Sequence, residues 1–92
     1  MAEIAASFRK GSGEVLDYQI DWAALLGTDT IATSAWVVDA GLTKDSDTNS
    51  TATTTVWLSG GTVGTDYACE NTITTAEGRT HQRTLGVQVI DR

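Results

Sequence analysis

The sequence has no proline, and among its 92 residues it has only one cysteine, one histidine and six basic residues. Cys69 cannot form an internal disulfide, which argues against the disulfide-rich scaffolds of small secreted domains and favours assembly in a reducing compartment. No second histidine or cysteine is present to build a zinc site. No segment approaches the roughly 18 consecutive apolar residues of a membrane helix, and residues 1–10 lack the apolar run of a signal peptide.

Basic residues are also scarce relative to acidic ones, since twelve acids and six bases give a net charge of -6. A broad basic face for nucleic acid is therefore not expected. The charge is uneven, because residues 14–77 hold ten acids and a single base, whereas the other bases lie near the two ends. Two interpretations stay open: a solvated acidic surface, or basic ends that dock on an acidic neighbour.

What the sequence has in abundance is threonine, with sixteen residues, and threonine favours β-strands. Apolar and polar residues alternate with the period of a strand over 14–22, 51–58, 66–75 and 80–90. A further strand is expected over 30–38, with a bulge between Ile31 and Trp36, and a short one over 42–45. The pattern predicts an all-β protein, an immunoglobulin-like two-sheet β-sandwich of about seven short antiparallel strands.

The alternation begins only near Glu14, after the glycine-rich joint KGSG. We therefore expect a flexible N-terminal arm over residues 1–13 and a single sandwich domain over residues 14–92. Tyr67 precedes Cys69 by two residues at the start of a strand, which is the position of a tyrosine corner. Cys69 itself is expected to be a small buried apolar residue.

The candidate chemical motifs are weak. Asp45-x-Asp47-x-Asn49 resembles the start of a calcium loop, but the glycine and the closing glutamate of such a loop are missing. His81 has no partner set for a catalytic triad, and the GGTVGT segment lacks the lysine of a phosphate-binding loop. We therefore expect no catalytic, cofactor-binding or metal-binding residues, and no enzymatic activity.

Protein–protein contact is the remaining role, and it has three groups of candidate residues. The arm offers two apolar anchors and a basic pair, which could add to a neighbour by strand pairing or groove insertion. An outward-facing tryptophan is either incidental or an interface anchor, and a basic hairpin lies near residues 76–83. The candidate interaction residues are Ile4, Phe8, Arg9, Lys10, Trp57, Arg79, His81 and Arg83.

Three extended strings carry a family resemblance: DYQIDWAALLGTDTIATSAWVVDAGLT, TTTVWLSGGTVGTDY and NTITTAEGRTHQRTLGVQVIDR. They resemble small immunoglobulin-like bacteriophage proteins of the fibre–tail adaptor family. The resemblance implies a virion structural component, an adaptor or decoration subunit on the tail, neck or capsid that is made in the host cytoplasm. Its partners would be other virion proteins (portal, neck, tail, fibre or capsid), contacted by multiple copies in a symmetric assembly, with no nucleic acid and no membrane. The alternative is a module that recognises host-surface carbohydrate.

Overall fold

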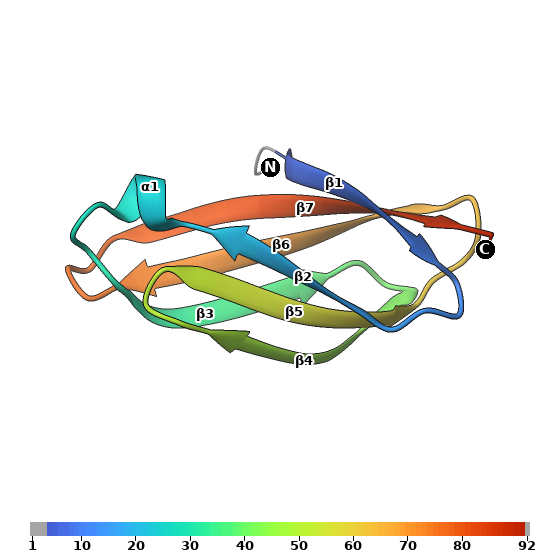
Figure 1. Cartoon of the computed structure of the whole chain (residues 1–92), viewed down its shortest axis with the longest axis horizontal. Helices are drawn as coiled ribbons and strands as arrows, with labels where there is room; N and C mark the ends of the chain where they lie inside the picture. The colour runs from blue at the N-terminus through green and yellow to red at the C-terminus, as the bar shows by residue number, and fades with distance from the viewer. Residues whose placement is uncertain (1–3, 92) are drawn as a thin grey trace.

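A computed structural model describes residues 4–91 of the chain, with side chains described from residue 6 onward. Within this range the chain forms seven strands and one short helix, packed as two sheets (Figure 1). The predicted all-β sandwich is therefore confirmed. The elements are β1 (Ile4–Gly11), β2 (Leu16–Asp21), α1 (Ala23–Leu26), β3 (Ile31–Val38), β4 (Leu42–Asn49), β5 (Thr53–Gly60), β6 (Asp66–Thr75) and β7 (Thr80–Ile90).

The four-stranded sheet has the order β1-β7-β6-β3 and the three-stranded sheet has the order β2-β5-β4. If the strands are lettered A to G along the chain, the sheets are A-G-F-C and B-E-D. The groups C-F-G and B-E-D are those of an immunoglobulin constant-type sandwich, in which, however, strand A belongs to the B-E-D sheet. Four of the five strand pairs are antiparallel as predicted. The first strand departs from the prediction, because β1 pairs with β7 in parallel at the edge of the four-stranded sheet.

The N-terminal segment differs most from its prediction. Residues 4–11 do not form a free arm, since β1 pairs with β7 from Ile4 to Gly11, with a register shift between Ile4 and Ala6. Phe8 packs against the core with its ring 4.9 Å from that of Tyr18, and Lys10 is fully buried. The alternation of apolar and polar residues in β1 is hard to recognise in the sequence, because a lysine, Lys10, occupies an inward position. Residues 1–3 of the predicted arm lie outside the described residues.

The predictions for individual segments of the remaining chain were confirmed in part. The segment after β2 forms α1, which ends at Gly27 with a φ of 59°. The bulge expected after Ile31 is present as a register shift between Ile31 and Thr33. The short strand expected over 42–45 is longer than predicted, because β4 extends through the polar residues up to Asn49. An edge strand of this kind is stabilised by backbone bonds to β5, so its side chains can stay exposed and carry no apolar signal.

The core lies between the two sheets and contains Trp22, which is fully buried, and the buried Trp36. The tyrosine corner is present, because the backbone N–H of Thr62 donates to the Tyr67 hydroxyl at 2.9 Å. Burial raises the pKa of the Cys69 thiol to about 11, with the nearby Asp39 carboxylate adding to the shift. Cys69 is thus the inert core residue that was expected.

Candidate protein-interaction surface

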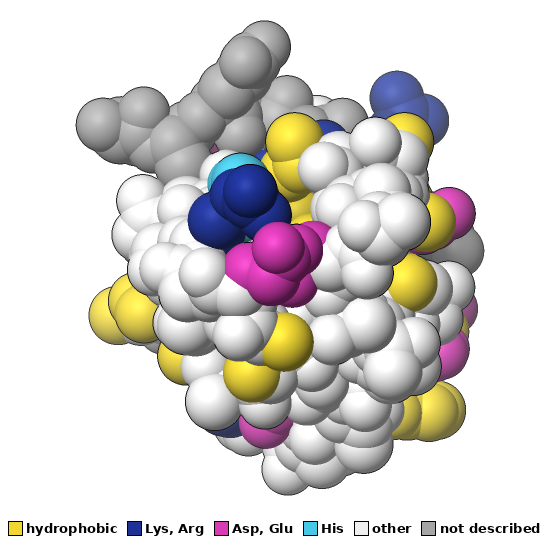
Figure 2. All heavy atoms as spheres, turned by 90° about the vertical axis from the view of Figure 1, so that its left-hand side faces the viewer, with side chains coloured by type: hydrophobic (Ala, Val, Ile, Leu, Met, Phe, Trp, Pro, Cys, Tyr) yellow, Lys and Arg dark blue, Asp and Glu magenta, His cyan; other side chains and the backbone are white. Residues whose placement is uncertain are grey.

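The loops at one end of the sandwich surround a charged hollow. We call this end of the molecule the α1 end. Figure 2 views the molecule from this side and shows basic, acidic and histidine side chains gathered beside hydrophobic ones. The α1 end consists of α1, the loop before β3 and the turn between β6 and β7. Its hollow of about 500 Å³ is lined by Leu25, Leu26, Gly27, Thr28, Asp29, Glu77, Arg79 and His81.

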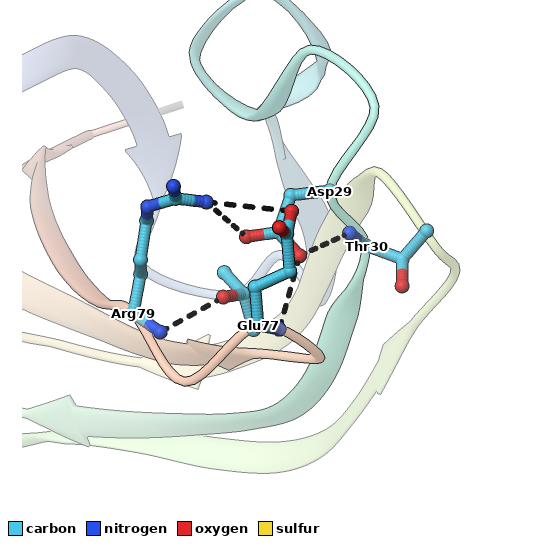
Figure 3. Close-up of polar contacts among 5 residues, drawn as sticks. Asp29, Thr30, Glu77 and Arg79 are labelled. Atoms are coloured by element: carbon cyan, nitrogen blue, oxygen red, sulfur yellow. Dashed lines mark hydrogen bonds and ion pairs between the residues drawn. The ribbon is translucent and has the colours of Figure 1, made fainter.

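Asp29 organises this end from a position where its side chain is only 2% exposed. One carboxylate oxygen accepts the backbone N–H of Thr30 at 2.9 Å and that of Glu77 at 3.3 Å. The other accepts Nη1 of Arg79 at 3.2 Å, so one carboxylate ties the loop before β3 to the turn between β6 and β7 (Figure 3). A hydrogen bond from the Thr75 hydroxyl, followed by these contacts, lowers the pKa of Asp29 below its ordinary value.

Arg79 is held in place while it stays accessible. Its side chain is 60% exposed, yet Nη1 contacts Asp29 at 3.2 Å and Oε2 of Glu77 at 3.4 Å. Its backbone N–H donates to the Thr75 hydroxyl oxygen at 3.0 Å, which fixes the turn from which the side chain projects. A guanidinium oriented in this way loses little conformational freedom when a partner binds.

His81 and Arg83 border the α1 end, and both side chains also lie near the buried ring of Trp22. The Arg83 guanidinium carbon is 4.7 Å from the centre of the Trp22 ring, and Nη1 contacts the carbonyl oxygen of Asp21 at 3.4 Å. The His81 ring lies 6.4 Å from the ring of Trp22. Both side chains are half-buried, so they cover the tryptophan as well as bordering the α1 end.

The structure does not bring the predicted interaction residues into one site. Arg9 is exposed on the outer face of the four-stranded sheet, whereas Phe8 points inward and is half-buried. The prediction of Lys10 as an interaction residue is wrong. Its ammonium is buried and donates to the carbonyl oxygens of Gly11 and Gly60, each at 2.8 Å. It is therefore not available for docking. The side chain of Ile4 lies outside the described side chains.

Trp57 faces outward from β5, as its parity predicted, and is 40% exposed. It lies on the three-stranded sheet, apart from Arg79 and from Arg9. Sequence reasoning found Arg79 but missed Asp29, because its loop gives no local signal and its partners lie 48 and 50 positions away.

The described part of the chain lacks the features of two other classes of site. Residues 4–91 contain no group of three or more His, Cys, Asp or Glu residues placed to hold a metal ion. In the same range, no helix is long and apolar enough to cross a membrane.

The two packed sheets define a small protein of the β-sandwich class. A family model described as podophage GP4 fiber-tail adaptor protein gp77 matches residues 10–88. The chain belongs to this family, and it is therefore a structural component of a phage tail that binds other tail or fibre proteins. A search of curated proteins finds no match.

Proposed function

We propose that this protein attaches a fibre or a neighbouring protein to the phage tail through the α1 end, as an immunoglobulin-like adaptor present in several symmetry-related copies. The observation that carries the proposal is the arrangement around Arg79. Its guanidinium is 60% exposed, yet it is oriented by the buried carboxylate of Asp29. The adjacent hollow has an apolar side at Leu25, which is 46% exposed. A charged group and an apolar contact side by side are what an interface anchor needs.

Two further observations and one general rule support the details of this proposal. The strand order supports the immunoglobulin-like description. A lone buried cysteine fits a protein made and assembled in the reducing host cytoplasm. Closed symmetry is common for small structural subunits, which supports multiple copies. The carbohydrate-recognition alternative has no support beyond the exposed Trp57.

The test is incorporation of the full chain into particles that lack this protein, measured as copies per particle by quantitative mass spectrometry. We expect Arg79→Glu to reduce incorporation by at least about tenfold, because it places a carboxylate against the partner and against Asp29. Arg79→Gln removes the charge with less effect on the fold, and it should show a smaller loss. Thermal melting verifies that each variant is folded.

Arg9→Glu is the matched control, since it makes the same change of charge on an exposed side chain of the other face. Incorporation of Arg79→Glu and Arg79→Gln at the parental level would rule out the α1 end as the docking surface. Equal losses in Arg9→Glu and Arg79→Glu would show that the effect is not specific to the α1 end, which would overturn the proposal.

A further inference from the structure

The outer face of the three-stranded sheet carries an aromatic platform. Trp57 is the one aromatic among the exposed large hydrophobic side chains of residues 6–91, and Val15, 57% exposed, precedes the neighbouring strand β2. In the sheet register, Trp57 is directly paired with Asp17 of β2 on one side and with Ser46 of β4 on the other. Directly paired residues on one face have Cβ atoms about 5 Å apart, so a carboxylate borders the indole ring.

Every charge that faces outward from this sheet is negative. Asp17 has no hydrogen-bond or ion-pair partner for its carboxylate within the described residues. Asp45 also faces outward, since it accepts the Ser59 hydroxyl at 3.1 Å, and Ser59 has the same parity as Trp57. Asp21 lies further along β2 on the same face as Asp17.

The one base on these three strands does not neutralise this face. Lys44 is paired in register with Leu58, which is fully buried, so it has the parity of inward positions. Its ammonium contacts Oδ1 of Asp47 at 3.3 Å, and Asp47 is paired in register with the buried Val56. This ion pair therefore lies on the inner side of the edge strand and leaves the outer face acidic.

We propose that this face binds an arginine side chain on an extended basic segment of a fibre or tail protein. The guanidinium plane stacks on Trp57 while its N–H groups pair with Asp17. Planar cations favour the faces of tryptophan rings, and guanidinium groups pair with carboxylates through two parallel hydrogen bonds. A sugar would need the platform but not the surplus of negative charge. Since an adaptor must contact two partners, this second surface rests on the proposed function and adds to it.

The probe is a tetra-arginine peptide, titrated into the full chain and followed by backbone amide and indole N–H resonances. A tetra-citrulline peptide, which keeps the shape and lacks the charge, serves as the ligand control. We expect saturable shifts at Asp17, Ser46 and Trp57 with the arginine peptide, which weaken as salt rises. Trp57→Ala and Asp17→Asn should each raise the dissociation constant about three- to fivefold.

Asp66→Asn is the matched control variant, because it removes one exposed acid from the strand β6 of the other sheet. If it weakens binding as much as Asp17→Asn does, the attraction is general and the proposal is wrong. Equal binding of the citrulline peptide would also overturn it, as would shifts of the Trp57 face by neutral oligosaccharides but not by arginine. Neither result depends on Arg79, so failure here is distinguishable from failure of the α1 end.

Discussion

Replacing Asn71 with alanine removes the side chain at the centre of a buried hydrogen-bond network between the two sheets. Asn71 is fully buried on β6. Its Oδ1 accepts Nε1 of Trp22 at 3.2 Å and the Thr54 hydroxyl at 2.7 Å. Its Nδ2 donates to the Ser34 hydroxyl oxygen at 2.9 Å and to the carbonyl oxygen of Ala35 at 3.0 Å.

The expected loss of unfolding free energy depends on which hydrogen bonds each partner of Asn71 keeps in the variant. Nε1 of Trp22 still reaches the Thr54 oxygen at 3.1 Å, so this donor stays bonded. The Thr54 hydroxyl loses the acceptor for its proton in a fully buried position, which costs about 1–3 kcal/mol. Loss of the two Nδ2 bonds and a small unfilled volume add about 1 kcal/mol more. We therefore expect Asn71→Ala to lower the free energy of unfolding by about 2–4 kcal/mol.

The assay is urea unfolding followed by tryptophan fluorescence, with the slope checked against the parent. Asn49→Ala is the control, because Asn49 is exposed and should change stability by less than about 0.5 kcal/mol. In a double-mutant cycle, Thr54→Val and Asn71→Ala should couple by at least about 0.5 kcal/mol. An Asn71→Ala variant within about 1 kcal/mol of the parent, with an unchanged slope, would refute this account of the network.

Three further substitutions test other contacts. Tyr67→Phe removes the corner hydrogen bond and should cost about 1 kcal/mol, seen as a melting temperature lower by roughly 4–8 °C; equal melting would contradict the corner. Hydrogen bonds, first from Thr75, lower the pKa of Asp29 below 3.8, so its carboxylate stabilises the fold above about pH 4 and that contribution is lost as pH falls. Urea unfolding should therefore show a larger loss for Asp29→Asn at pH 7 than near pH 3. Phe8→Ala should cost about 2 kcal/mol in thermal unfolding, against less than about 0.5 for exposed Ser7→Ala, whereas a free arm would give no difference.

The sequence was most informative where inward positions are apolar. The two longest strands were predicted with their observed bounds, 66–75 and 80–90, because buried side chains alternate through most of both strands. The hairpin expected near residues 76–83 has its turn between these strands, where Gly78 has a φ of 87° that suits glycine. In these segments the local pattern and the tertiary packing agree, so the pattern alone was sufficient.

The missed elements depend on partners that are remote in the sequence. The ammonium of the inward-facing Lys10 in β1 donates to a carbonyl oxygen 50 residues away in the sequence. Because the sequence does not show this partner, Lys10 is predicted to be part of a flexible polar joint. Likewise, Asp29 became visible as an organising residue only when the fold placed its loop against the turn that carries Arg79. The alternation of apolar and polar residues does not reveal such a contact, because only one side chain makes it.

These remote contacts also bear on how the protein can act as an adaptor. Lys10 joins β1 of one sheet to Gly60 at the end of β5 in the other, near the corner made by Tyr67. Asp29 fastens the loops at the α1 end. The Asp29 contacts lie within the four-stranded sheet, whereas the bonds from Lys10 to Gly60 and from Thr54 to Asn71 join the two sheets. A shift of one sheet against the other would break these two bonds. In the two-surface arrangement that we propose, these bonds between the sheets oppose a change in the spacing between Arg79 and Trp57.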